Sequence, residues 1–312
     1  MFNNIYGNYY PKKLIESLIK KDRIVHTIII NGENGLGKLT FAKNIASQIV
    51  YNQPYTQNIN NYIDINIING NDTGSILINN IREIKNSINN TPHEGKKKVQ
   101  IIANCDKMTI QAQNALLKSL EEPSSTTVFI LTVSNKQKLL GTILSRGIII
   151  NMEPIPENQI ITILSEQYKT ADLQTIIRVA KISSGNLGLC KKILSTPANK
   201  NILDICEKLL FYILTSNEYE IMIILSKYEK DKLGLIFLLE LFKLFFCKVL
   251  KMYLTGNNLN NIIINYSENK HLIPELKNKT YILDLIDKSL NYTLANVNIK
   301  LILAWLNINL AF

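Results

Sequence analysis

Five short apolar runs and the amphipathic stretches between them organise the first half of the chain. The runs that we expect to form buried strands are residues 25–30, 63–68, 98–103, 126–133 and 148–152. Between the runs, apolar residues recur every three or four positions, which is the spacing of a helix with one buried face. These helical segments are residues 41–50, 76–88 and 108–120. Strands that alternate with helices predict an α/β fold with a parallel, doubly wound sheet.

Two of these helices carry a clear apolar stripe that predicts which face is buried. The stripe of the segment 76–88 is made of Leu77, Ile81, Ile84 and Ile88. The stripe of the segment 108–120 is made of Met108, Ala112, Leu116 and Leu120. Pro123 ends the second helix, because a proline cannot continue the hydrogen-bond ladder.

The alternation of strands and helices stops at Pro154-Ile155-Pro156, and only helical periods follow. The helices expected there are residues 157–168, 171–182, 187–194, 233–250, 282–292 and 297–310. In the most apolar of them, residues 233–250, the charged side chains Glu240, Lys243 and Lys248 share one polar arc, so we expect an amphipathic helix and no membrane span. The sequence therefore predicts three domains: a nucleotide-binding α/β core at 1–154, a three-helix domain at 155–197 and a helical domain at 198–312.

A glycine-rich loop, Gly32-Glu33-Asn34-Gly35-Leu36-Gly37-Lys38-Leu39-Thr40, lies between the first predicted strand and the first predicted helix. In such a loop the glycines let backbone N–H groups converge on an anion, and the lysine reaches the outer phosphates. The candidate nucleotide-binding residues are Gly32, Gly35, Gly37, Lys38 and Thr40. The alternative is a glycine turn in some other α/β unit.

The groups that would hold magnesium are missing from this loop and from the end of the third strand. Leu39 stands where the motif needs Ser or Thr, and the hydroxyl of Thr40 comes one residue late, about 100° around a helix. The third strand ends in Ala103-Asn104-Cys105-Asp106, where a working ATPase carries carboxylates at the first two places. Asp106 comes late and is expected to cap the following helix. The pattern predicts a cradle for ATP or ADP without proper magnesium coordination.

Composition describes a folded protein of 312 residues, with 46% hydrophobic residues, 19% charged residues and a net charge of +10. It is neither that of a disordered chain nor that of a membrane protein. No secretory signal is visible at the first residues, which favours the cytoplasm. The four cysteines are scattered without a C-x-x-C pair, so neither zinc nor a disulfide framework is expected.

The positive charge favours an anionic partner such as DNA. The lysine runs Lys96–Lys98 and Lys191–Lys192 are the candidates for phosphate contacts. The alternative for both runs is an ordinary solvated face.

Several motifs together resemble one known family. They are Asn114-Ala-Leu-Leu-Lys-Ser-Leu-Glu-Glu-Pro123, Leu139-Leu-Gly-Thr-Ile-Leu-Ser-Arg146, the phosphate loop with His26 six residues before it, Ile81-Arg-Glu-Ile84, and Ser184-Gly-Asn-Leu-Gly188. This set is similar to the clamp-loader branch of the AAA+ ATPases, over residues 1 to about 195. The matching motif residues are Asn114, Lys118, Glu121, Glu122 and Ser145.

The resemblance implies a subunit of a five-membered complex that places a ring-shaped sliding clamp on primed DNA. It implies an AAA+ core, a helical lid and a helical collar. The implied partners are the gamma/tau and delta subunits, with the sliding clamp and primer–template DNA reached through the complex, and no membrane. Arg146 matches an arginine that reaches the ATP site of the neighbouring subunit in trans. The alternative is a structural arginine that pairs with a glutamate or a helix end.

The resemblance also exposes differences from active relatives. Gly188 stands at the lid position of a phosphate-sensing arginine, and Gly147 replaces the usual cysteine after Ser-Arg. We therefore expect a catalytically silent subunit that supplies Arg146 to its neighbour. The alternatives are an active gamma/tau-type motor subunit and a standalone DNA-binding module.

Overall fold

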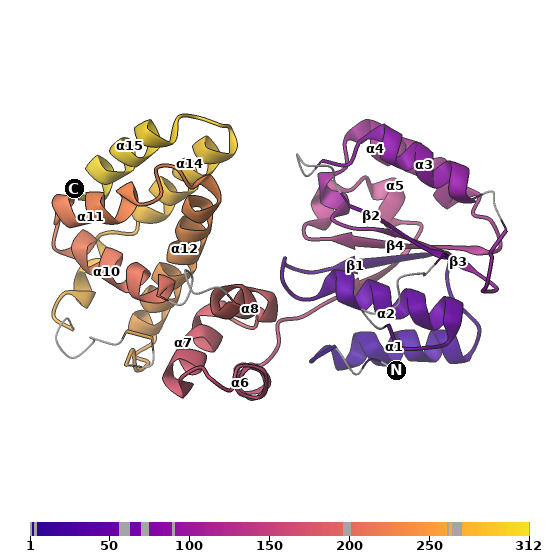
Figure 1. The fold of residues 1–312 in the computed structure, drawn as a ribbon, viewed down its shortest axis with the longest axis horizontal. Coiled ribbons are helices and arrows are strands. Elements are labelled where there is room, and N and C mark those ends of the chain that lie inside the picture. The colour runs from indigo at the N-terminus through magenta and orange to yellow at the C-terminus, as the bar shows by residue number, and fades with distance from the viewer. Residues whose placement is uncertain are drawn as a thin grey trace. The chain divides into compact units, whose positions relative to one another are not determined.

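The computed structural model describes residues 2, 5–55, 63–69, 75–88, 91–195, 201–260, 262–263 and 270–311. The chain divides into two compact units (Figure 1). The first unit is Met1–Gln159 together with Gly185–Gly188, and the second is Ile160–Ser184 together with Leu189–Phe312.

A parallel sheet forms the centre of the first unit. In the described residues it has five strands in the order β2-β3-β4-β1-β5. The strands are β1 (Thr27–Asn31), β2 (Ile65–Ile68), β3 (Lys98–Ile102), β4 (Thr127–Val133) and β5 (Ile148–Asn151). Ile28 of β1 lies beside both Ile130 of β4 and Ile148 of β5, and every pair of neighbours is parallel. The predicted α/β fold with a parallel sheet is confirmed.

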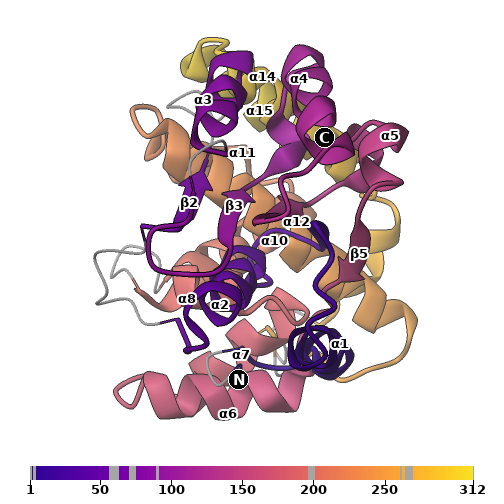
Figure 2. The same cartoon turned by 90° about the vertical axis from the view of Figure 1, so that its right-hand side faces the viewer.

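Helices cover both faces of this sheet (Figure 1, Figure 2). They are α1 (Tyr9–Lys20) and α2 (Lys38–Tyr51) on one face, and α3 (Ile78–Ile88), α4 (Ile110–Glu121) and α5 (Gly141–Leu144) on the other. Two short 3-10 turns, η1 (Cys105–Lys107) and η2 (Lys136–Lys138), follow β3 and β4. This arrangement buries both faces of the inner strands β1, β3 and β4, as is typical of parallel sheets with nearly continuous apolar strands, whereas β2 and β5 at the edges are partly exposed.

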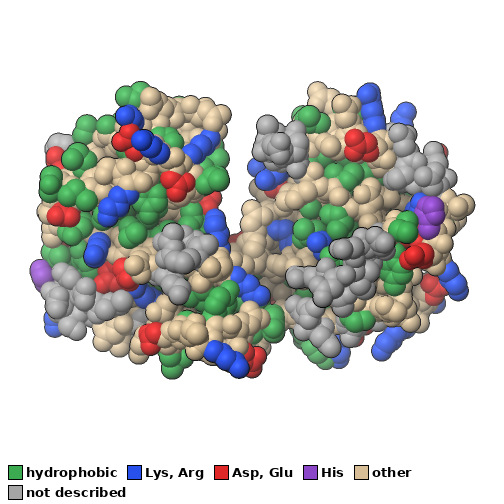
Figure 3. Space-filling view, in the orientation of Figure 1, with side chains coloured by type: hydrophobic (Ala, Val, Ile, Leu, Met, Phe, Trp, Pro, Cys, Tyr) green, Lys and Arg blue, Asp and Glu red, His purple; other side chains and the backbone are tan. Residues whose placement is uncertain are grey.

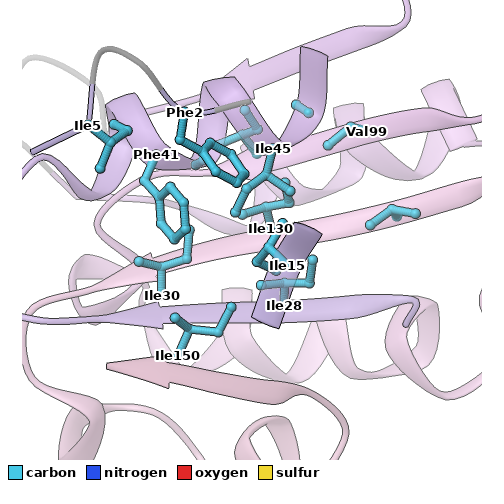
Figure 4. Close-up of a cluster of buried hydrophobic side chains, with 14 of the residues drawn as sticks. Phe2, Ile5, Ile15, Ile28, Ile30, Phe41, Ile45, Val99, Ile130 and Ile150 are labelled. Atoms are coloured by element: carbon cyan, nitrogen blue, oxygen red, sulfur yellow. The ribbon is translucent and has the colours of Figure 1, made fainter. Parts of the chain in front are cut away.

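The core between the sheet and the helices α1 and α2 fixes the phosphate loop at one end. Phe41 and Ile45 of α2 are fully buried and pack with Ile30 and Ile130 of the sheet (Figure 4). The ring of Phe2 meets the ring of Phe41 edge-on, with 5.1 Å between centroids. Burying a side chain of this size stabilises the fold by about 1.5–3 kcal/mol. The helix that follows the loop is thus held firmly against the strand that precedes it.

Two details differ from the sequence-based expectations. The helix after the phosphate loop begins at Lys38, three residues earlier than predicted, since Gly37 turns the chain directly into it. In the predicted stripe of α3, Ile81 and Ile84 are buried, but Leu77 precedes the helix and is 41% exposed. The side chain of Ile88 lies outside the described residues. The predicted stripe of α4 is confirmed, since Met108, Ala112, Leu116 and Leu120 are all buried.

After β5 the described residues form helices and no further strand. The helices are α6 (Glu157–Gln167), α7 (Leu173–Ser183), α8 (Leu187–Ser195), α10 (Ile202–Leu214), α11 (Glu218–Ser226), α12 (Lys232–Leu254), α14 (Ile282–Leu294) and α15 (Ile299–Ala311), with a 3-10 helix η3 (Ile273–Lys277). The apolar segment 233–250 forms part of α12, and none of the described helices has the length and apolarity to cross a membrane. The predicted boundary at 197 lies outside the described residues, and the three-domain division stays a prediction.

A buried ion group ties two helices of the second unit together. The guanidinium of Arg178 on α7 donates to the carboxylates of Asp204 and Glu207 on α10, and Arg178 and Glu207 are both nearly inaccessible to solvent. Arg178 also donates to the carbonyls of Leu203 and Ile262. Removing one partner from such a group leaves a charge buried without compensation.

We expect Asp64→Ala to lower the free energy of unfolding by about 2–4 kcal/mol, because three backbone N–H groups lose a charged acceptor. The buried carboxylate of Asp64, just before β2, accepts hydrogen bonds from the N–H groups of His93, Glu94 and Gly95 at 2.8, 2.8 and 2.9 Å. Burial acts to raise the pKa of Asp64, but these hydrogen bonds outweigh it and hold the pKa below its usual 3.8.

Because the pKa is lowered in the folded state, this stabilisation is present above pH 4 and is lost as the pH falls through the folded pKa. Urea unfolding of wild type and variant should therefore differ at pH 7 and converge in acid. Glu94→Ala, which changes an exposed side chain of the same loop and keeps its N–H, is the control. A difference between wild type and Asp64→Ala that did not change with pH would contradict this account.

Candidate functional site

The glycine-rich loop has the strand–loop–helix geometry that the sequence predicts. It leaves the carboxyl end of β1, and Gly35 and Gly37 have φ angles of 87° and 85°, which an L side chain rarely adopts. A hollow of about 290 Å³ lies against it, lined by loop residues 34, 35 and 37–40 and by Ala103, Asn104, Thr132 and Gly188. The predicted binding residues Gly35, Gly37, Lys38 and Thr40 thus share one cavity, while Gly32 lies at its strand side.

The ammonium of Lys38 is turned back onto its own loop. It donates to the carbonyls of Gly32 and Glu33 at 2.6 and 2.9 Å and to the hydroxyl of Ser134 at 3.0 Å. Burial lowers the pKa of Lys38 from 10.5 to about 8, against the opposite effect of the carboxylates of Asp106 and Glu33. Every proton of the ammonium therefore has an acceptor from the chain itself.

Among the described residues, those that line the hollow include no aspartate or glutamate that could hold magnesium. Leu39 and Ala103 offer apolar side chains there. The backbone N–H of Asn104 donates to the hydroxyl of Thr132 at 3.0 Å, and its side-chain amide donates to the amide oxygen of Asn69 at 3.2 Å. Magnesium prefers carboxylate and phosphate oxygens in octahedral geometry. The residues present do not fit that ion.

Asp106 does not cap the following helix, so this prediction is wrong. The 3-10 turn η1 separates Asp106 from α4, whose N-cap is Thr109, with its hydroxyl accepting from the N–H of Ala112 at 3.2 Å. The carboxylate of Asp106 instead accepts a hydrogen bond from the N–H of Ser134 at 3.0 Å. Asp106 thereby holds the end of β4 close to the lysine of the loop.

Arg146 lies at the surface, at the end of α5. Its guanidinium donates to the carboxylate of Glu121 at 2.8 Å and to the carbonyl of Thr142 at 2.6 Å, while the hydroxyl of Ser145 donates to the same carbonyl at 3.1 Å. The Arg146 and Glu121 side chains are 32% and 46% exposed. An ion pair this open to solvent contributes about 0–1 kcal/mol. The guanidinium can therefore exchange Glu121 for another anion at little cost.

The other motif residues are also on the surface. Asn114, Lys118 and Glu121 share the exposed face of α4, and Glu122 is exposed at its end. Arg146 donates hydrogen bonds to both Glu121 and Ser145. Among the described residues, no side-chain hydrogen bond joins Asn114, Lys118 or Glu122 to that group.

The sheet separates Arg146 from the phosphate loop. Arg146 precedes β5, whose first residue pairs with Ile28 near the start of β1, while the loop follows Asn31 at the end of β1. In a parallel sheet these are opposite edges, separated by roughly 10 Å or more at 3.3 Å per residue. Arg146 therefore faces away from the hollow of its own chain.

Gln113 is a positioning residue that the sequence reasoning missed. It is buried in α4, where its amide nitrogen donates to the carbonyl of Lys138 at 3.0 Å and its amide oxygen accepts from the N–H of Leu140 at 2.9 Å. These bonds hold the segment that leads into α5 and Arg146. The signal in the sequence was a polar residue next to the apolar stripe position Ala112.

The side chains of the two lysine runs differ in their surroundings. Lys98 is buried in β3, whereas Lys96 is exposed. The ammonium of Lys192 lies 3.9 Å from the centre of the Phe237 ring. On the face drawn in Figure 3, Lys and Arg side chains are scattered among other types.

A phosphate loop after β1 of a parallel sheet in this order, joined to a series of helices, is the AAA+ form of the α/β fold. Residues 8–156 match the family described as DNA polymerase III, delta subunit. This part of the chain is therefore similar to subunits of the DNA polymerase III clamp loader, the family that the motifs of the sequence resemble.

Curated relatives carry subunit names from the same complex. The chain is 28% identical to DNA polymerase III subunit gamma/tau of Mycoplasma genitalium, over 96% of this chain and 55% of that protein. It is 31% identical to subunit delta' of Bacillus subtilis, over 50% of each chain. The chain thus spans only about half the length of these relatives.

A solved structure extends the likeness in fold. The gamma subunit-related protein of Thermotoga maritima has a TM-score of 0.55 and 22% identity, covering 95% of this chain and 98% of that one. At this identity the likeness concerns the fold alone, and it includes the helices after β5.

We expect Gln113→Leu to lower the free energy of unfolding by about 1–3 kcal/mol, because a buried N–H and a buried carbonyl lose their partner. Urea unfolding measures this loss. Gln111→Leu, an exposed position of the same helix, is the matched control and should change it by less than about 0.5 kcal/mol. Equal effects of the two substitutions would contradict the role assigned to Gln113.

Proposed function

We propose that this chain is a delta-prime-like, catalytically silent subunit of a bacterial DNA polymerase III clamp loader. It helps to place the sliding clamp on primed DNA in the cytoplasm and lends Arg146 to the ATP site of a neighbouring subunit. The observation that carries the proposal is the position of Arg146, exposed at the sheet edge opposite its own phosphate loop. An arginine in that position is available to a second chain and unavailable to its own.

The proposed chemistry of Arg146 is electrostatic. A guanidinium offered in trans neutralises the charge that builds on the transferring phosphoryl group and can bind two of its oxygens at once. In the isolated chain the carboxylate of Glu121 forms an ion pair with this guanidinium. A phosphate, with more negative charge and more acceptor oxygens than a carboxylate, competes well for it.

The hollow beside Lys38 supports the proposal that this chain does not hydrolyse ATP itself. With Leu39, Ala103 and Asn104 in place of the magnesium-binding groups, ATP or ADP taken up there would be held without proper metal coordination. The proposed partners are the gamma/tau and delta subunits, with the clamp and primer–template DNA contacted through the complex. Residues 155–197 and 198–312 would serve as lid and collar.

A second candidate is an active gamma/tau-type clamp-loader ATPase. It is favoured by one observation: the gamma/tau relative of Mycoplasma genitalium aligns over 96% of this chain, whereas the delta' relative aligns over 50%. A standalone DNA-binding module has less support, because Lys98 of its longest lysine run is buried.

Arg146→Ala in a reconstituted loader should lower kcat for DNA-stimulated ATP hydrolysis by about 10³-fold or more, the usual contribution of an arginine supplied in trans. The exposed Arg82 of α3 provides the matched control, and Arg82→Ala should leave kcat unchanged. Assembly of each complex is checked by size-exclusion chromatography. An assembled Arg146→Ala complex with full ATPase activity would refute the trans role.

ATP turnover by the purified chain alone distinguishes the two candidates. The silent subunit should give the same background rate for wild type and Lys38→Ala, because the missing magnesium ligands already prevent catalysis. A Lys38-dependent rate on the order of 1 s⁻¹, ordinary for an enzyme, would select the gamma/tau-type ATPase instead.

A further inference from the structure

The segment Gly185–Gly188 belongs to the first unit, although the residues on both sides of it belong to the second. It lies directly against the phosphate loop. The backbone N–H of Gly188 donates to the carbonyl of Gly35 at 2.9 Å, and the side-chain amide of Asn186 donates to the carbonyl of Asn34 at 2.6 Å. Both acceptors are backbone groups in the middle of the loop.

The contact is so close that it requires glycine on both sides. A Cβ atom added to Gly188 would lie 2.6 Å from the oxygen and 2.7 Å from the Cα of Gly35. A Cβ atom added to Gly35 would lie 2.1 Å from the amide oxygen of Asn186. Because Gly188 meets backbone atoms, a Cβ atom there forces one of the two backbones to move. At Gly35 the Asn186 side chain could turn aside, and the φ angle of 87° is what favours glycine.

The segment is also anchored on its far side. Gly185 has a φ angle of 95° and accepts a hydrogen bond from the N–H of Ile155 at 3.0 Å. A Cβ atom there would meet Pro154 at 2.3 Å. The segment is thus held between the Pro154-Ile155 turn and the loop.

Four consecutive carbonyls of the loop have a donor from the chain itself. Asn186 and Gly188 occupy two of its carbonyls, and the ammonium of Lys38 takes two more together with the hydroxyl of Ser134. The hollow that remains, about 290 Å³, is at the lower limit of the roughly 300–1,000 Å³ that small-molecule sites occupy.

We propose that Gly185–Gly188 is an internal latch that holds the phosphate loop in the place of a nucleotide. Gly188 is the residue that makes the latch possible, because any side chain there would part the two backbones. A nucleotide must draw Lys38 away from Gly32 and Glu33. It must also shift the loop against the Asn186 and Gly188 contacts, which hold the carbonyls of Asn34 and Gly35 in place. The latch concerns the chain by itself and stands whether or not Arg146 acts in trans.

The test uses Gly188→Ala in the full chain, measured without other loader subunits. Amide hydrogen exchange over residues 33–38 should be at least tenfold faster than in wild type, and ADP binding by calorimetry should be at least tenfold tighter. Gly141→Ala is the matched control, because a Cβ atom there meets nothing within 4 Å. It should change neither exchange nor affinity.

Asn186→Ala removes one hydrogen bond of the latch without adding an atom, and it keeps the test decisive if Gly188→Ala fails to fold. It should give smaller changes in the same direction. Unchanged exchange in the folded variants, or wild-type protein that binds ADP as tightly as they do, would overturn the latch. The ATPase result for Arg146→Ala is independent of this outcome, so the two proposals fail separately.

Discussion

The parallel pairing of β1 with β5 is the constraint on which the functional interpretation depends. It places everything that follows β1 at one edge of the sheet and everything that precedes β5 at the other. The phosphate loop and Arg146 are therefore held at opposite edges by backbone hydrogen bonds, whatever their side chains do. Because β1 is buried between β4 and β5, a one-residue slip of its register is strongly disfavoured. The distance between the phosphate loop and Arg146 is thus fixed by the fold.

At the carboxyl edge of the sheet, amide side chains stand at the ends of strands. Asn104 after β3 pairs with Asn69 after β2, and Asn31 of β1 pairs with Asn151 of β5. An amide both donates and accepts, so two of them satisfy each other without a cation. Two carboxylates in the same places would repel and would need a metal ion or a proton between them. The amide pairs therefore stabilise this edge of the sheet without a metal ion. The side-chain amide of Asn186 likewise satisfies a carbonyl of the phosphate loop without a ligand.

The sequence was sufficient for the sheet because buried parallel strands leave a clear pattern. All five apolar runs became strands with ends within about two residues of the prediction, and the three inner strands are covered on both faces. The motif residues were also found from the sequence, because their types and spacing are specific.

Two kinds of feature could not be predicted. Asp106 looked like a helix cap because nothing in the sequence revealed the 3-10 turn η1 before α4. The contacts of Gln113 with Lys138 and Leu140, and of Gly188 with Gly35, join residues far apart in the chain, and spacing carries no information about such distances.

Lys38 and Arg146 differ in burial, and this difference gives the two cations different roles. Lys38 is only 6% exposed and its pKa is lowered to about 8, so its charge is costly and is satisfied by three oxygens of its own chain. Moving it to a phosphate means breaking those bonds in a place where water does not replace them. Arg146 keeps a third of its side chain in solvent, where the exposed carboxylate of Glu121 and the carbonyl of Thr142 hold it. An arginine also stays charged at any physiological pH. Lys38 thus stabilises the loop of its own chain. Arg146 can exchange its partners, and a group that acts on a second subunit needs this property.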